Sequence, residues 1–101
     1  MSWRNRHAHD AKCRDLLRAT ADRLDRLRSL VERSGPDVRE EMERTLDTLR
    51  GQRNRLSARV EAARLATDDA WTFARAIADQ AADELVSGLD SMEARLKRLA
   101  A

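Results

Sequence analysis

The sequence predicts an all-α protein built on an antiparallel helical hairpin of coiled-coil type. Three observations lead to this fold class. Charged residues make up 38% of the 101 residues and aromatic residues 3%, a composition typical of long amphipathic helices. Apolar residues recur at heptad spacing on both sides of a single turn. That turn, residues 34–37, is the one place where a glycine adjoins the only proline.

The turn separates two predicted helices, residues 3–33 and 37–66, within a single helical domain spanning 1–101. Gly35 suits the left-handed position just past a helix end, and Pro36 suits the first position of the following helix. Asp37 and Glu40 then fall in the first turn of the second helix, where carboxylates oppose the positive end of the helix dipole. The chain is therefore expected to reverse direction here.

Each of the two helices carries one apolar stripe, and the two stripes align across the turn. In the first helix the stripe begins at Trp3 and Cys13. Pairs such as Leu24 with Leu49 lie symmetrically about the junction of Pro36 and Asp37, so the heptads and the turn give the same register. The predicted hairpin core is Leu17, Leu24, Leu27, Val31, Met42, Leu46, Leu49, Leu56 and Val60.

The same register places polar residues inside the seam. Thr20 lies opposite Arg53, and Asp10 lies opposite Ala63. A polar residue in a coiled-coil core more often sets register or partner number than chemistry. Gly51, in the middle of the second helix, is expected to weaken it by up to ~1 kcal/mol relative to alanine.

A third amphipathic segment, residues 67–100, follows the hairpin. The second helix either continues into it or breaks near Thr67, where two aspartates follow, and Ser87 with Gly88 is a plausible kink. The segment either folds back as a third helix or pairs with another subunit. Because the stripe of the second helix is narrow, we expect pairing between subunits. The expected self-association residues are Ile77, Ala81, Leu85, Leu89, Met92, Leu96 and Leu99.

The residues near the first helix start raise the question of a metal. His9 and Cys13 are four residues apart on one helical face, which is half of a zinc site. His7 and Asp10 lie beside them, but no second group of His or Cys completes four ligands within one chain. Binding across a symmetry axis stays open. We assign no metal and no cofactor, and the single cysteine cannot form an internal disulfide.

Nothing in the sequence indicates catalysis. It contains no glycine-rich phosphate loop and no tyrosine, and both histidines lie near the amino terminus. The numerous carboxylates are spaced as helix-surface partners of arginine. We therefore expect a protein that is not an enzyme and has no small-molecule substrate.

Charge suggests one alternative function. Residues 1–66 carry a net charge of +5 and residues 67–101 a net charge of −3. Local density of basic groups favours phosphate binding, so non-specific nucleic-acid binding is the alternative function. The residues that would make the contact are Arg50, Arg53, Arg55, Arg59 and Arg64.

The amino terminus is basic but leads into no apolar segment of a secretory signal, and no run reaches the ~18 apolar residues of a membrane span. The sequence therefore predicts a cytoplasmic location.

Part of the chain resembles small bacterial coiled-coil proteins, some described as stress-induced and most without an assigned function. The resemblance rests on the stretch from Leu46 to Leu56 with its arginines, on the junction from Ala66 to Trp71, and on the alanine-rich amphipathic end. It covers about half of the chain and implies a helical hairpin with an amphipathic tail. Together with the patterns above, it predicts a non-enzymatic coiled-coil interaction or scaffold protein that forms homo-oligomers, with a further protein partner possible.

Overall fold

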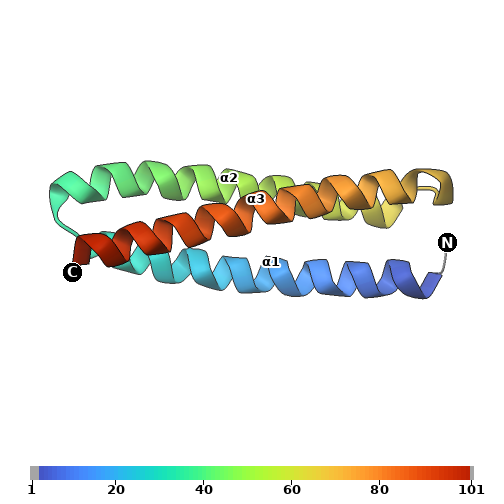
Figure 1. The fold of residues 1–101 in the computed structure, drawn as a ribbon, viewed down its shortest axis with the longest axis horizontal. Helices are drawn as coiled ribbons and strands as arrows, with labels where there is room; N and C mark the ends of the chain where they lie inside the picture. Colours follow the sequence, from blue (N-terminus) through green and yellow to red (C-terminus); the bar gives the residue numbers. More distant parts are fainter. Residues whose placement is uncertain (1–2, 101) are drawn as a thin grey trace.

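The computed structural model describes residues 3–100, which form three α-helices of similar length, each antiparallel to the one before it (Figure 1). The helices are α1 (Trp3–Glu32), α2 (Pro36–Leu65) and α3 (Asp68–Ala100). No strand occurs between residues 3 and 100, so the predicted all-α class is confirmed, and α1 with α2 forms the predicted hairpin. None of the three helices is long and apolar enough to cross a membrane.

The first turn lies where it was predicted, but Gly35 does not take the expected left-handed conformation. Its φ and ψ are −64° and 160°, which is extended backbone. The residue before a proline is restricted to extended conformations, and Pro36 imposes this on Gly35. The end of α1 is closed instead by the backbone N–H groups of Arg33 and Ser34, which donate to the carbonyls of Leu30 and Val31.

The second turn shows that the chain breaks at Ala66 and Thr67 and that α3 folds back along the hairpin. The molecule is 51 Å long, whereas a continuous helix from residue 37 to 100 would span about 95 Å. Ala66 is extended, with φ −63° and ψ 145°, and α3 starts directly after Thr67 with Asp68 and Asp69 in its first turn. Of the two alternatives at Thr67, the break is the one observed.

Arg6 of α1 explains how α2 ends without a glycine or proline. Its guanidinium donates to the carbonyls of Ala66 at 2.7 Å and of Ala63 and Arg64 at 3.3 Å, and to Asp68 Oδ1 at 3.0 Å. The last carbonyls of a helix lack partners within the helix, and a cationic side chain satisfies them well. One side chain of α1 therefore fastens the turn between α2 and α3.

Removing this cap is expected to destabilise the bundle. Arg6→Met should lower the free energy of unfolding by about 1 kcal/mol, because it removes several hydrogen bonds with a charged donor from a partly exposed site. The exposed Arg4, replaced in the same way, is the matched control and should change stability by less than ~0.5 kcal/mol. Urea unfolding followed by circular dichroism measures both; equal effects would contradict the capping role.

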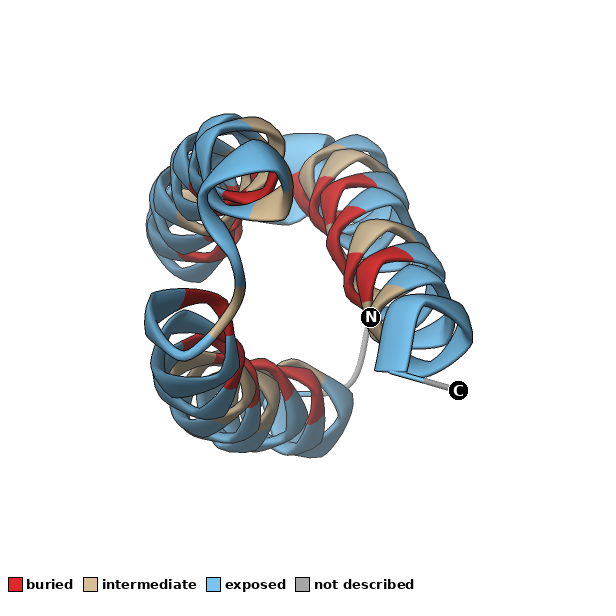
Figure 2. Ribbon diagram, turned by 90° about the vertical axis from the view of Figure 1, so that its left-hand side faces the viewer, coloured by how far each residue is buried: buried red, intermediate tan, exposed pale blue. Residues whose placement is uncertain are grey.

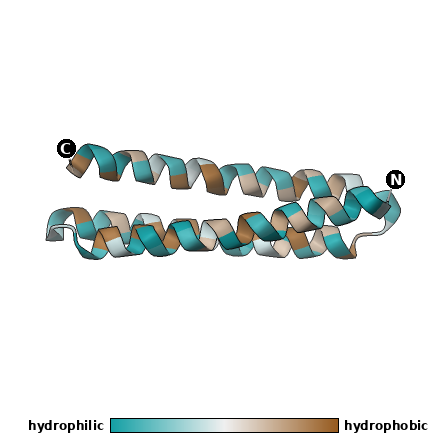
Figure 3. Cartoon of the chain, turned by 90° about the horizontal axis from the view of Figure 1, so that it is seen from below, coloured by the Kyte–Doolittle hydropathy of each residue, from teal (hydrophilic) through white to brown (hydrophobic). Residues whose placement is uncertain are grey.

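The core runs the length of the bundle and follows the predicted stripes (Figures 2 and 3). Of the nine residues of the predicted hairpin core, eight are buried and Leu17 is half-buried against them. Trp3, expected at the head of the stripe, is instead 75% exposed, with its ring 4.1 Å from the ring of His7. The burial at that end comes from Trp71 of α3, which is 2% exposed.

The polar pair inside the seam makes backbone contacts. Arg53 donates from Nε and Nη2 to the carbonyl of Leu17, at 3.1 and 2.9 Å. The hydroxyl of the buried Thr20 donates to the same carbonyl and to that of Leu16. The predicted register placed Thr20 opposite Arg53. The arginine contacts α1 at Leu17, about one helical turn before Thr20.

The expected exposure of the third segment is wrong. Four of its seven stripe residues are buried in the same chain, Ile77 and Leu96 are half-buried, and only Leu99 is exposed. α2 contacts both neighbours with one set of residues, because these point toward the bundle axis rather than toward one partner. A narrow stripe is therefore sufficient for a three-helix core. The four buried residues are Ala81, Leu85, Leu89 and Met92.

Candidate functional site

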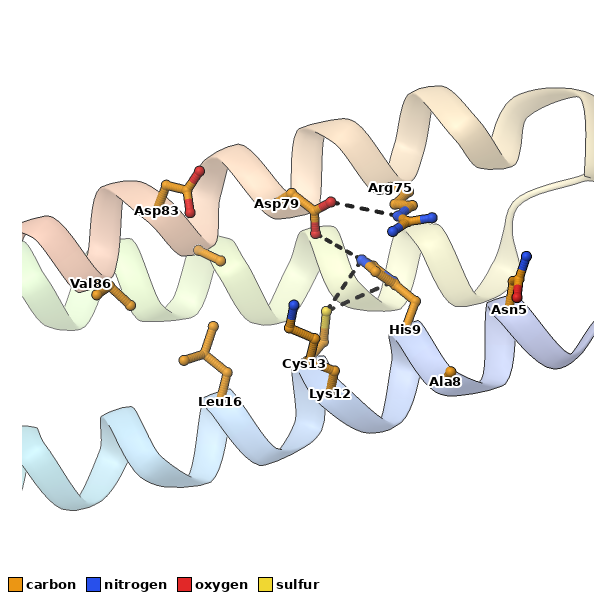
Figure 4. Close-up of a pocket in the computed structure, with 11 residues that line it drawn as sticks. Asn5, Ala8, His9, Lys12, Cys13, Leu16, Arg75, Asp79, Asp83 and Val86 are labelled. Atoms are coloured by element: carbon orange, nitrogen blue, oxygen red, sulfur yellow. Dashed lines mark hydrogen bonds and ion pairs between the residues drawn. The ribbon is translucent and has the colours of Figure 1, made fainter.

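The most chemically distinctive group of side chains lies where α1 faces α3 (Figure 4). His9 Nε2 is 2.9 Å from Asp79 Oδ1, and Cys13 Sγ is 3.6 Å from His9 Nε2 and 3.9 Å from His9 Nδ1. One donor atom from each of the three residues lies within 4.8 Å of the others. Residues 70 positions apart in the sequence thus converge at one point. We call His9, Cys13 and Asp79 the α1–α3 cluster.

Packing holds the cluster in place. His9 and Cys13 are one helical turn apart and both are buried, whereas the Asp79 side chain is about half exposed. Trp71 meets the imidazole of His9 edge-on, with ring centroids 5.9 Å apart. Arg75 lies 5.3 Å from the Trp71 ring and 3.7 Å from Asp79 Oδ2. The imidazole is therefore bounded by Trp71 on one side and by Asp79 on another.

The electrostatic environment keeps the thiol of Cys13 protonated. Burial raises its pKa most, and the nearby carboxylates of Asp79 and Asp10 raise it further. Lys12 and Arg75 act in the opposite direction but do not outweigh these effects. A neutral thiol is a poor nucleophile, so the cluster alone does not resemble a cysteine nucleophile activated by histidine.

A hollow of about 730 Å³ opens beside the cluster, between α1 and α3. A second hollow of about 550 Å³ lies between the same two helices toward the carboxyl end of the chain. Arg23 of α1, which lines this second hollow, binds Asp90 at 2.7 Å and Glu93 at 2.9 Å. These hydrogen bonds raise the pKa of Arg23, and the bond to Glu93 has the largest effect. The α1–α3 face is thus hollowed at two places along its length.

The structure brings together part of the residues that raised the metal question. His9 and Cys13 meet as expected from their spacing. His7 instead packs against Trp3 with the two rings tilted, and Asp10 pairs with Arg14 at 2.8 Å. The third member, Asp79, was missed, because no local pattern links it to His9. One signal could have linked Asp79 to His9. Two contacts between the parallel helices α1 and α3 join residues 70 positions apart, namely His9 with Asp79 and Arg23 with Glu93.

The basic stretch of α2 is largely engaged within the chain. Arg53 binds the Leu17 carbonyl, and three other arginines lie within 4.0 Å of a carboxylate oxygen. Arg59 is exposed and makes no ion pair with any residue between 3 and 100. Intrachain acceptors therefore compete for most of the charges that would bind phosphate. The three pairs are Arg50 with Asp47, Arg55 with Glu84, and Arg64 with Glu61.

No family model, curated protein or solved structure matches this chain. The resemblance to small bacterial coiled-coil proteins stays a prediction.

Proposed function

We propose that this protein is a non-enzymatic helical interaction protein whose α1–α3 face binds a second copy of the chain. The observation that carries the proposal is the pair of hollows along that face. The hollows on the other sides of the bundle are smaller, about 440 and 280 Å³ beside α1 and α2 and about 270 Å³ between α2 and α3. On the α1–α3 face, apolar side chains remain partly open to solvent. They are Leu16, Leu30, Val86 and Leu96, which line the two hollows.

The size of the face suits a dimer. The bundle measures 51 by 18 Å in its two longer dimensions. One long face is therefore on the order of 900 Å², close to the ~800 Å² that each partner contributes to an interface of standard size. The face also keeps part of the originally expected self-association stripe, since Leu96 lines the second hollow and Leu99 is 49% exposed.

The charges of the two helices favour a second copy as the occupant. α1 carries eight basic and five acidic side chains, a net charge of +3, and α3 carries four basic and seven acidic side chains, a net charge of −3. A two-fold axis parallel to the bundle would place α1 of each copy against α3 of the other. This arrangement sets opposite charges facing each other twice, as a self-complementary interface requires.

The test is sedimentation of the full chain over a range of concentrations. The unmodified protein is expected to form a dimer at micromolar concentration, with a melting temperature that rises with concentration. Replacing Leu30 and Leu99 together by glutamate should produce a monomer of unchanged helicity, because both side chains are about half exposed and so contribute little to the folded monomer.

Leu65→Glu is the matched control. Leu65 is 68% exposed, but it ends α2 at the opposite end of the molecule from Leu30 and Leu99 (Figure 1). This variant should dimerise as the unmodified chain does. A monomer at every concentration, or equal loss of the dimer in the control, would contradict the proposal.

A further inference from the structure

The donor atoms of the α1–α3 cluster converge on one point, since all three lie within 4.8 Å of one another. Tetrahedral Zn²⁺ with bonds of ~2.0 Å to nitrogen or oxygen and ~2.3 Å to sulfur holds its ligand atoms about 3.3–3.6 Å apart. Sγ of Cys13 and Nε2 of His9 are 3.6 Å apart, and Nε2 and Asp79 Oδ1 are 2.9 Å apart. The sulfur of Cys13 and the oxygen of Asp79 lie within 4.8 Å of each other, so rotations of the His9 ring and of the half-exposed Asp79 side chain would bring all three atoms to the tetrahedral spacing.

We propose that His9, Cys13 and Asp79 form a binding site for one Zn²⁺ ion per chain, held between α1 and α3. Imidazole nitrogen, thiolate sulfur and carboxylate oxygen are the three ligand types that zinc takes from proteins. The proposal does not depend on self-association, since one chain supplies all three ligands.

Charge balance supports a divalent ion at this position. On binding, the Cys13 thiol releases its proton to solvent and forms a zinc–sulfur bond, and Asp79 is already a carboxylate. Thiolate and carboxylate together carry two negative charges, which the ion neutralises. A buried charge is tolerated only when it is paired in this way. The metal thus replaces the proton on a thiol that burial otherwise keeps neutral.

The fourth position of the ion faces the hollow of about 730 Å³. Three protein ligands with one open position are the arrangement of zinc sites that hold a water molecule or an external ligand, whereas purely structural sites are closed by four protein ligands. The polar lining of the hollow includes Asn5, Lys12 and Asp83, which come from both helices. A water or a small anion is the fourth ligand that such surroundings accept.

Cobalt titration of the full, reduced chain tests the proposal, because Co²⁺ takes zinc sites and reports on sulfur ligation by absorption. The expected result is one Co²⁺ per chain, a thiolate-to-cobalt charge-transfer band in the near ultraviolet, visible bands of tetrahedral intensity, and displacement of cobalt by Zn²⁺. Cys13→Ser should abolish the charge-transfer band. Asp79→Asn should weaken cobalt binding at least about tenfold.

Asp83→Asn is the matched control for Asp79→Asn. Asp83 lies one turn further along α3 and lines the same hollow, so it shares the local charge but not the position of a ligand. The Asp83→Asn variant should bind cobalt with the same affinity as the unmodified chain. Equal weakening in the two variants would mean that the site merely attracts cations, and would overturn the assignment of Asp79.

A measurement on the unmodified chain keeps the test independent of whether the variants fold. A ligand that binds only the folded state raises the melting temperature of the protein, so Zn²⁺ should raise the melting temperature of this chain. Zn²⁺ should also protect Cys13 from alkylation by iodoacetamide. Absence of the charge-transfer band, or one metal ion shared by two chains, would overturn a site made within a single chain.

Discussion

Replacing Leu85 by alanine is expected to lower the free energy of unfolding by about 3 to 4 kcal/mol. Leu85 has no exposed surface, and it lies on α3 in the core cluster that also holds Leu56 and Leu89. Truncation removes buried methyl groups and leaves a cavity that the surrounding helices fill only in part. Since small domains are stable by only ~5–15 kcal/mol, this one change removes a large share of the total. Urea unfolding followed by circular dichroism measures it.

Leu99→Ala is the control on the same helix. Its side chain is half exposed, so the loss should stay within ~0.5 kcal/mol for the monomer. If Leu85→Ala changed stability as little as Leu99→Ala, then α3 would not pack against the hairpin, and pairing between subunits would again be the better account of the stripe.

The hairpin was predictable because its signals are local. Pro36 sets the turn, and the heptad stripes of the flanking helices fix the register independently of it. The end of α2 had no such signal, because the group that caps its last carbonyls is Arg6, some 60 residues earlier in the sequence. A helix end capped by a distant side chain needs no glycine or proline of its own. Thr67 with the two aspartates after it was then the one local sign of a break, which is why a continuous helix was an equal alternative.

The position of α3 was misjudged for a geometric reason. The narrow apolar stripe of α2 was expected to pack against α1 alone. The buried side chains of α2 instead point at the bundle axis and contact α1 and α3 together. The candidate site follows the same logic. The spacing of His9 and Cys13 marks half of it, and Asp79 becomes visible only once α3 is known to lie parallel to α1.

Two glycines in the middle of helices allow the packing of α3 on α2 to be tested with one chemical change. A Cβ atom added at Gly51 meets no atom within 4 Å, whereas one added at Gly88 would lie 2.6 Å from Leu49 Cδ2 and 3.2 Å from Gln52 Oε1. Of these two glycines, Gly88 is therefore the one at which α3 lies close to α2. α3 runs as one helix from Asp68 to Ala100.

Gly51→Ala is expected to raise the free energy of unfolding by about 0.5 to 1 kcal/mol, because alanine restricts the unfolded chain and favours helix. Gly88→Ala gains the same stabilisation from the higher helix preference of alanine. It also forces Leu49 to move, and Leu49 is buried with Gln52 beside it. Overpacking of a core costs ~1–3 kcal/mol, so the net result should be a loss of about 1 kcal/mol. The two variants should thus differ by about 2 kcal/mol in urea unfolding at unchanged slope. Equal stabilisation by both would show that α3 lies farther from α2 than the close approach at Gly88 requires.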